Sequence, residues 1–295
     1  MNKNLTRILS HWGLQDCETK KIYDTAWQAG EHYVLKEYQD LNLLERNLKI
    51  LNILDEMDIP VGQVVLTKDN AQYVSEGKNF YFLSRRLSGN HIVKIDDVQT
   101  VATEMGKIIA NLHVAFKKCE IMDGFWENSL LDEMNGWVKE NFEKSGWNRL
   151  SCEEYEEVVS KLAGIYSELP VQLIHRDVHF GNFLFSDGSF SGYIDFDLSQ
   201  RNIRIFDICY FLLGLRSKEE EIQLTDEQWF TFLECVLRGY ETVLKLSETE
   251  KRAVPYVMEC IELLFVSYFE GENDLECADN AYEIYQFIRG QEDRI

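Results

Sequence analysis

The feature that most constrains the fold is a change in the spacing of apolar residues near Gly89. Before this point, short strand-like runs surround one amphipathic segment, as expected for strands around a helix. Beyond it, apolar residues recur every three or four positions over long stretches, as expected for long helices. In a chain of 295 residues, this order predicts a small mixed lobe, a short connector and a large helical lobe.

The first of these lobes is expected to hold strands around one helix. A strand is predicted over 32–38, after a turn at Ala29-Gly30. Leucines at positions 41, 44, 48, 51 and 54 predict a helix that ends near Met57. Pro60 follows closely, and the residue before a proline avoids helical geometry. Two more strands are predicted over 71–74 and 80–84.

The second lobe is predicted to consist of long helices and one segment that is not helical. An apolar stripe over 98–116 predicts the first helix. Ser151, Thr225 and Ser247 are each followed three positions later by Glu or Gln, which fits capping boxes at helix starts. Pro255 predicts an early kink in the last of these helices. Between the helices lies a compact strand-loop-strand segment, 172–196.

This strand-loop-strand segment carries polar residues between apolar runs. It reads His-Arg-Asp-Val-His-Phe-Gly-Asn over 175–182, and Tyr-Ile-Asp-Phe-Asp over 193–197. Transfer of the terminal phosphoryl group of ATP depends on positioning and on neutralisation of negative charge. Asp177 can orient an attacking hydroxyl and accept its proton, while Asn182 and Asp195 can supply oxygen ligands for magnesium. The spacing therefore favours a phosphoryl-transfer site.

The pattern His-x-Asp-x-His-x-x-Asn at 175–182, followed by Ile-Asp-Phe at 194–196, resembles the aminoglycoside phosphotransferase, choline kinase and type II homoserine kinase superfamily. It also matches the pattern of protein kinases. The resemblance implies an α+β, bilobal, protein-kinase-like fold. The small mixed lobe, with an antiparallel sheet, would bind the nucleotide over residues 1–87. The large, mainly helical lobe would carry catalysis and substrate binding over 88–295.

The resemblance also implies an activity and the roles of single residues. The enzyme would be a kinase that uses Mg²⁺ and moves the γ-phosphoryl group of ATP to a hydroxyl of a small molecule. Asp177 would be the catalytic base or hydroxyl-orienting group, and Asn182 and Asp195 would be the metal ligands. Lys36 would contact the nucleotide phosphates and be held by an ion pair with Glu45.

Two further roles follow from the same resemblance. Backbone groups of Ser84, Arg85, Arg86 and Leu87 would meet the adenine edge. Asp207, at the start of an apolar helix, would brace the catalytic loop.

The sequence departs from the superfamily pattern in three places. The phosphate-covering turn, residues 23–30, contains a single glycine, Gly30. Nucleotide affinity would therefore depend more on Lys36 and magnesium than on backbone amides. Arg176 stands where the small-molecule kinases commonly have glycine. Asp197 stands where protein kinases have glycine, and it is open whether it is a further metal ligand or a turn residue.

Two observations favour the small-molecule branch over protein kinases. Only eleven residues separate Asp195 from Asp207, too few for an activation loop, and the chain contains no Ala-Pro-Glu sequence. The acceptor stays open among an aminoglycoside-like antibiotic, choline or ethanolamine, homoserine, and another hydroxylated metabolite. The alternative is a catalytically silent kinase-like binding or scaffold protein, although Asp177, Asn182 and Asp195 are all present.

Composition limits the partners and the compartment. A formal net charge of −21 argues against a nucleic-acid-binding surface. No apolar run approaches the roughly 20 residues that a membrane helix needs, and residues 1–12 lack the apolar stretch of a secretory signal. Seven scattered cysteines, never in a Cys-x-x-Cys pair, indicate the reducing cytoplasm.

The negative charge also suggests a cationic acceptor. Carboxylates and aromatic rings attract an ammonium group through ion pairing and cation–π contact. The C-terminal region offers both kinds of side chain, at Glu259, Glu262, Tyr268, Phe269, Glu270, Tyr282 and Tyr285. The alternative is that the rings fill the core between helices and the glutamates face solvent.

Overall fold

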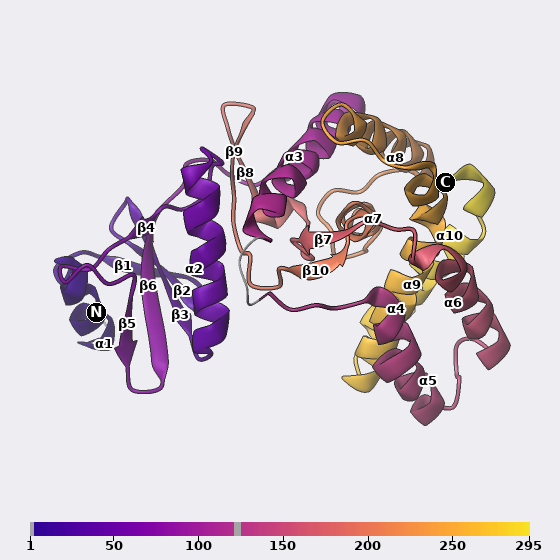
Figure 1. Cartoon of the computed structure of the whole chain (residues 1–295), viewed down its shortest axis with the longest axis horizontal. Helices are drawn as coiled ribbons and strands as arrows, with labels where there is room; N and C mark the ends of the chain where they lie inside the picture. Colours follow the sequence, from indigo (N-terminus) through magenta and orange to yellow (C-terminus); the bar gives the residue numbers. More distant parts are fainter. Residues whose placement is uncertain (1–2, 121–124) are drawn as a thin grey trace. The chain divides into compact units, whose positions relative to one another are not determined.

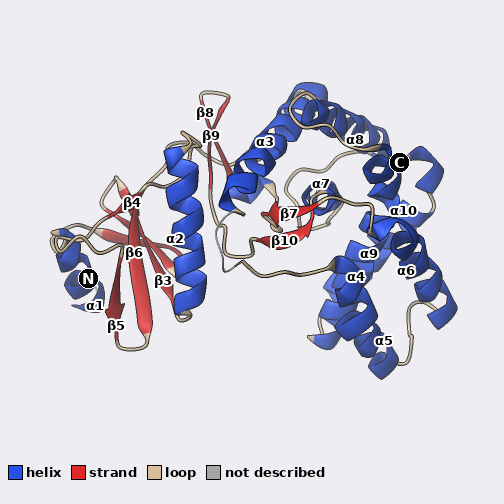
Figure 2. Cartoon of the chain, viewed as in Figure 1, coloured by secondary structure: helices blue, strands red, loops and turns tan. Residues whose placement is uncertain are grey.

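The computed structural model describes residues 3–120 and 125–295, and its chain divides into two compact units (Figure 1). The first unit comprises Met1–Ile92 and Phe180–Asp197. The second comprises Val93–His179 and Leu198–Ile295. Strands dominate the first unit and helices the second, as Figure 2 shows.

The first unit is built on a six-stranded antiparallel sheet. Its strands are β1 (Thr19–Tyr23), β2 (Ala26–Ala29), β3 (Tyr33–Tyr38), β4 (Val64–Val65), β5 (Tyr73–Glu76) and β6 (Asn79–Arg85). The order is β1-β2-β3-β6-β4, and β5 also pairs with β6. The N-terminal helix α1 (Lys3–Leu9) continues into a short 3₁₀ turn (Ser10–Trp12), and its Leu5, Ile8 and Leu9 share a core with sheet residues Leu35 and Leu83. The predicted strands are confirmed, with shifts of one or two residues at their ends.

The helix predicted after β3 is α2 (Leu41–Glu56). Asp40 has extended backbone geometry, and its side chain accepts a hydrogen bond from the Asn42 amide, so it caps the helix. Asp58 then takes a left-handed φ of 57° before Pro60, which confirms the predicted end.

The first unit also includes a hairpin from later in the chain. After a 3₁₀ turn (Phe180–Asn182), β8 (Phe183–Ser186) pairs with β9 (Ser189–Tyr193). Asn90 and Phe185 exchange two backbone hydrogen bonds of 2.9 Å. Gly89 makes this approach possible, since a Cβ there would lie 2.6 Å from the Phe185 carbonyl oxygen. The division predicted at residue 87 therefore differs from the structure, because contacts between distant chain segments join this hairpin to the first unit.

The second unit is mainly helical. Its helices are α3 (Val98–Cys119), α4 (Leu130–Glu133), α5 (Lys139–Ser145), α6 (Cys152–Tyr166), α7 (Ile205–Gly214), α8 (Asp226–Glu241), α9 (Glu248–Gly271) and α10 (Leu275–Arg289), with a π-helical turn (Met134–Val138) and a last 3₁₀ turn (Glu292–Arg294). Strands β7 (Val171–Ile174) and β10 (Gln200–Ile203) form an antiparallel pair.

Helices α3 and α8 lie side by side, with glycine at the contact (Figure 1). A Cβ on Gly106 would lie 2.1 Å from the Val236 carbonyl oxygen, and a Cβ on Gly239 would lie 2.1 Å from the Thr103 carbonyl oxygen. Only glycine therefore permits this separation of the two backbones.

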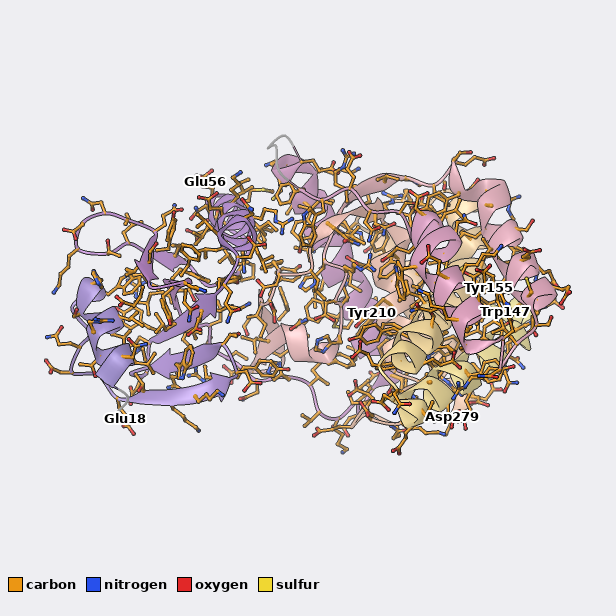
Figure 3. All side chains as sticks on the ribbon, turned by 90° about the horizontal axis from the view of Figure 1, so that it is seen from below. Glu18, Glu56, Trp147, Tyr155, Tyr210 and Asp279 are labelled. Carbon is orange, nitrogen blue, oxygen red and sulfur yellow. The ribbon has the colours of Figure 1, made fainter. Side chains whose placement is uncertain are left out.

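Helix caps in the second unit follow the sequence signals. Thr225 and Ser247 form complete capping boxes, and Ser151 accepts a hydrogen bond from the Glu154 amide. Helix α9 is continuous across Pro255, so the predicted kink does not interrupt it. The second unit also contains an aromatic pair: the rings of Trp147 and Tyr155, labelled in Figure 3, have centroids 5.5 Å apart.

All seven cysteines are free thiols, in agreement with the predicted absence of a disulfide framework. Among the described residues, no helix has both the length and the apolar character to cross a membrane.

Candidate active site

The loop after β7 is held by a fully buried carboxylate at the start of α7. Asp207 accepts hydrogen bonds of 2.8 Å from the backbone amides of His175 and Arg176. His113 Nε2 lies 2.9 Å from Asp207 Oδ2, and the other ring nitrogen lies 2.8 Å from the Tyr240 hydroxyl. A buried carboxylate with several donors is well satisfied. The role predicted for Asp207, bracing the catalytic loop, agrees with these contacts.

Arg176 explains one departure from the superfamily pattern. Its φ is 68°, in the left-handed region that favours glycine. An arginine is held there by two contacts: its Nη2 lies 2.9 Å from Glu133 Oε1, and its guanidinium lies 5.2 Å from the ring of Phe206. These contacts offset part of the backbone strain.

Asp177 follows directly and carries a partly exposed carboxylate. The Tyr210 hydroxyl, on α7, donates to Asp177 Oδ1 at 3.0 Å, and His179 Nε2 lies 3.6 Å from Oδ2. Burial opposes ionisation, but hydrogen bonding and attraction from His179, with the bond from Tyr210, lower the pKa of Asp177 to about 2. The carboxylate is therefore ionised at neutral pH, and it can orient a hydroxyl.

A pocket of about 180 Å³ lies within the second unit, next to two side chains that contact this carboxylate. Tyr210 and His179 line it from the catalytic side, and Glu262, Phe265 and Phe269 line it from α9. Tyr210 thus links Asp177 to the pocket. Sequence patterns did not indicate Tyr210; its position one turn after Asp207 on the same helix was the available signal.

Of the seven residues predicted to attract a cationic acceptor, only Glu262 and Phe269 line this pocket. Glu270 forms an ion pair with Arg149, and Tyr285 donates a hydrogen bond of 2.8 Å to Glu154. The remaining predicted residues are Glu259, which is buried beside Arg289; Tyr268, which is half-exposed; and Tyr282, which stacks on Tyr285. On α9, the rotation of the helix determines which of the predicted residues line the pocket, because neighbouring positions face different surroundings.

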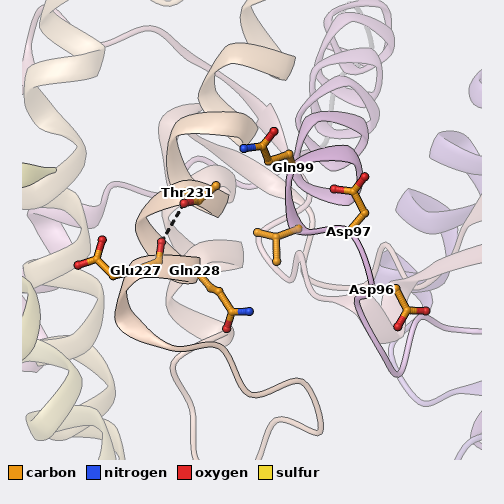
Figure 4. A pocket seen from close by; sticks show the side chains of 7 residues that line it. Asp96, Asp97, Gln99, Glu227, Gln228 and Thr231 are labelled. Atoms are coloured by element: carbon orange, nitrogen blue, oxygen red, sulfur yellow. Dashed lines mark hydrogen bonds between the residues drawn. The ribbon is translucent and has the colours of Figure 1, made fainter.

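A larger hollow, of about 550 Å³, lies where α3 and α8 begin (Figure 4). Asp96, Asp97 and Glu227 on its rim are exposed, and Thr231 uses its hydroxyl to bond the Glu227 carbonyl at 2.9 Å. None of the residues predicted to carry chemistry lines it, so the smaller pocket beside Asp177 is the better candidate site despite its size.

In the first unit, Lys36 on β3 contacts two carboxylates. Its Nζ lies 2.9 Å from Asp195 Oδ1 and 2.7 Å from Asp197 Oδ2. Burial alone would lower the pKa of Lys36, but the charges of Asp197 and Asp195 outweigh it and raise that pKa. The predicted ion pair with Glu45 is wrong for this structure, because Glu45 is exposed on α2 and does not contact Lys36.

The contribution of α2 comes instead from Asn47, two positions further along the helix. Two positions correspond to about 200° of rotation, so Asn47 and Glu45 project from different faces. Asn47 Nδ2 and the Tyr38 hydroxyl each donate to Asp197 Oδ1 at 2.6 Å. Asp197 is therefore more than a turn residue: it joins β3 and α2 to the segment that carries Asp195.

Asn182 and Asp195 are brought together by the hairpin. The Ile194 amide donates to the Asn182 carbonyl at 3.1 Å, and Asp195, with a left-handed φ of 61°, has a half-exposed carboxylate. The side chains of Asn182, Asp195 and Asp197 offer only hard oxygen donors, which suits magnesium. No group of three or more His, Cys, Asp or Glu side chains in the described part of the chain could hold a metal by itself. Magnesium sites commonly use one or two carboxylates and complete their shell with phosphate and water, so the residues fit.

The segment predicted to meet adenine lies at the end of β6. Ser84 pairs with strands on both sides, and the amides of Arg85 and Arg86 each donate to a main-chain carbonyl of the same unit at 2.8 Å. Leu87 lies beyond the strand, and its amide takes no part in sheet pairing. Of the four predicted amides, Leu87 is the one whose use costs no sheet hydrogen bond.

Comparisons with known proteins bear on the family and the fold of the chain. The model of the phosphotransferase enzyme family (APH) matches residues 16–249. Homoserine kinase of Gluconobacter oxydans (strain 621H) is 29% identical over 169 residues, which are 55% of this chain and 51% of that protein. The chain thus spans about half the length of this curated relative.

Solved structures resemble the whole chain. Amicoumacin kinase hAmiN, in complex with AMP-PNP, Ca²⁺ and Ami, superposes with a TM-score of 0.74 at 16% identity and covers 99% of this chain and 92% of its own. A microcompartment-associated aminopropanol kinase gives a TM-score of 0.67 at 18% identity, with 99% and 96% covered. At identities this low, the structural similarity establishes the fold alone. The predicted α+β protein-kinase-like class is confirmed. Because the family model spans well over half of its residues, the chain belongs to the phosphotransferase enzyme family.

Proposed function

We propose that this protein is a small-molecule kinase that transfers the γ-phosphoryl group of ATP to a hydroxyl group. The observation that carries the proposal is Asp177, an ionised carboxylate on a loop braced by Asp207, with Tyr210 joining it to a pocket. Kinases place such a carboxylate beside the attacking hydroxyl. The AMP-PNP bound to hAmiN supports an adenine nucleotide as the donor.

In this mechanism Asp177 accepts a hydrogen bond from the acceptor hydroxyl. Its pKa of about 2 makes it a weak base, so the proton moves to it only as the new bond to phosphorus forms and the bond to the leaving ADP breaks. Tyr210 holds the carboxylate in place through its hydroxyl. When bound, ATP would supply the phosphoryl group and magnesium would neutralise part of its negative charge. Asn182 and Asp195 would hold the metal, and Lys36 would contact the phosphates.

We further propose that the acceptor is cationic. The net charge of −21 favours capture of a positive substrate, and the pocket beside Asp177 contains carboxylates and aromatic rings. An aminopropanol kinase among the structural neighbours and a homoserine kinase among the relatives both carry names of amine-bearing acceptors.

Substitution of Asp177 tests the proposal. We expect Asp177→Asn and Asp177→Ala to lower kcat for phosphoryl transfer by about 10²–10⁴-fold, because they remove the positioned carboxylate. Affinity for a fluorescent ATP analogue should change little. Asp195→Ala should instead weaken binding of the magnesium nucleotide. Asp132→Asn, at an exposed position on α4, is the matched control.

The alternative, a silent kinase-like binding protein, gives a different result. Wild-type protein would then bind the nucleotide but consume no ATP with any member of a panel of amino alcohols, aminoglycosides and sugars. Turnover of Asp177→Ala within tenfold of wild type would contradict the mechanism itself.

A further inference from the structure

The pocket beside Asp177 contains a buried carboxylate that no protein group neutralises. Glu262, on α9, is 3% exposed, and no ion pair or hydrogen bond of its side chain occurs within residues 3–120 and 125–295. The apolar part of the pocket lining includes Leu213, Phe265 and Ile284. A buried carboxylate without a partner is costly, so the group keeps its proton until a cation pairs with it.

The lining beside Glu262 suits an ammonium group. The rings of Phe265 and Phe269 stack with centroids 5.9 Å apart, and the ring of Tyr210 lies 6.0 Å from that of Phe265. Aromatic faces around a carboxylate provide cation–π contacts in addition to the ion pair. The pocket therefore offers, at one end, a carboxyl group that a bound ammonium group would keep ionised, with aromatic walls beside it.

Tyr210 connects the Glu262 end of the pocket with Asp177, where the reacting hydroxyl would bind. Its hydroxyl donates to Asp177, and burial together with the charges of Asp177 and Glu262 raises the pKa of Tyr210. Both carboxylates thus act on one tyrosine side chain. A ligand that reaches from Asp177 past Tyr210 to Glu262 would carry its hydroxyl group at one end and its ammonium group at the other.

The size and charge of the pocket narrow the ligand further. Its volume of about 180 Å³ equals the liquid volume of about six water molecules and is below the roughly 300–1,000 Å³ of sites for drug-sized ligands. Its lining includes the carboxylates of Glu219 and Glu262 and no lysine or arginine. A ligand carboxylate would meet repulsion there without a compensating cation.

We infer that Glu262 binds the ammonium group of a short amino alcohol without a carboxylate, whose hydroxyl is phosphorylated beside Asp177. The inference rests on the proposed function, and it selects among the acceptor classes that the sequence left open. Homoserine, with its carboxylate, and aminoglycosides of several rings are disfavoured by the same lining.

The test compares acceptors on the wild-type protein. Ethanolamine and 1-amino-2-propanol are matched with their neutral isosteres, ethylene glycol and 1,2-propanediol, and with homoserine and kanamycin. We expect kcat/KM for the two amino alcohols to exceed that of every other member by at least about thirtyfold, as for a buried charge pair. A neutral diol, homoserine or kanamycin as the best acceptor would overturn the inference.

Glu262→Gln keeps the size of the side chain and removes its charge. We expect KM for the amino alcohol to rise about thirtyfold or more, with kcat and affinity for the fluorescent ATP analogue nearly unchanged. Glu276→Gln, exposed on α10, is the matched control. An unchanged KM in Glu262→Gln contradicts the inference. Should this variant fail to fold, the wild-type acceptor comparison decides by itself.

Thermal shifts separate the inference from the proposed function. If the amino alcohols raise the Tm of wild type but not of Glu262→Gln while no acceptor is phosphorylated, the binding site stands and the kinase proposal fails. If neutral acceptors are phosphorylated as well as amines, the kinase proposal stands and the role of Glu262 is refuted.

Discussion

At the scale of residues, the carboxylate partner of Lys36 comes from an unexpected part of the chain. Asp197 receives hydrogen bonds from Lys36, Tyr38 and Asn47, while Glu45 on α2 stays exposed. Asp197 therefore holds Lys36 as the helix glutamate does in the pattern that the sequence resembles. Of the two roles left open for Asp197, metal ligand or turn residue, neither describes these contacts: Asp197 positions Lys36.

Substitution of Asp197 should affect the nucleotide more than the acceptor. Asp197→Asn removes a charge-assisted hydrogen bond to Lys36, for which about 1.5–3 kcal/mol is typical, so we expect KM for ATP to rise about 10- to 100-fold. KM for the acceptor should change little, and Glu45→Gln should leave both values within about twofold. Steady-state kinetics with both substrates varied measure this. A larger effect for Glu45→Gln than for Asp197→Asn would instead support the ion pair between Lys36 and Glu45 that the sequence predicts.

Glu262 also predicts how stability depends on pH. Burial raises the pKa of Glu262 to about 8, whereas a glutamate in an unfolded chain titrates near about 4.3. Between these values the unfolded state releases a proton that the folded state keeps. The free energy of unfolding therefore falls as pH rises, by at most about 1.4 kcal/mol per pH unit. Glu262→Gln removes this loss, so its Tm relative to wild type should rise from about pH 5 to about pH 8.

The comparison with wild type isolates Glu262, because the other titratable groups of the pocket (His179, Tyr210, Glu219 and Cys277) are common to both proteins. Differential scanning fluorimetry across this pH range gives the measurement, with Glu276→Gln expected to show a flat difference. A flat difference for Glu262→Gln would mean that its carboxylate is solvated in the folded protein.

At the scale of elements, the contact between α3 and α8 acts indirectly on the loop at 175–177, through Asp207. His113 on α3 and Tyr240 on α8 are hydrogen-bonded to each other, and His113 in turn contacts Asp207. Gly239 lies next to Tyr240, at a point where the two backbones approach closely. The spacing of the helices therefore sets the position of the brace.

Gly239→Ala tests this dependence. A Cβ 2.1 Å from the Thr103 carbonyl oxygen forces the helices apart, so we expect a loss of about 1–3 kcal/mol or more in the free energy of unfolding, with a lower kcat. Gly164→Ala on α6, where a Cβ meets nothing within 4 Å, should gain about 0.5–1 kcal/mol. Urea denaturation of both variants gives the comparison. Equal stabilities would show that the helices can separate freely.

At the scale of the whole molecule, the residues predicted to carry chemistry are divided between the two units. The braced loop, Asp177 and the pocket belong to the second unit, whereas Lys36, Asn182, Asp195 and Asp197 belong to the first. The motif at 175–182 crosses from one unit to the other along the chain. This one short loop therefore contributes a predicted site residue to each unit, Asp177 to the second and Asn182 to the first.

Local patterns in the sequence determined the elements and the family. Helix caps, apolar periodicity and the spacing of Asp177, Asn182 and Asp195 act over a few residues, so they are legible without tertiary structure. The predicted starts of α3, α6, α8 and α9 agree with the structure for this reason.

Tertiary structure alone decided which side chains meet. The choice of Asp197 and Asn47 over Glu45 depends on how α2 is rotated against β3, and the selection of Glu262 among several C-terminal carboxylates depends on which face of α9 lines the pocket. The joining of the β8–β9 hairpin to the first unit depends on contacts such as Asn90 with Phe185. These outcomes arise from packing between distant segments, and rotation by one or two helix positions changes them without altering any local pattern.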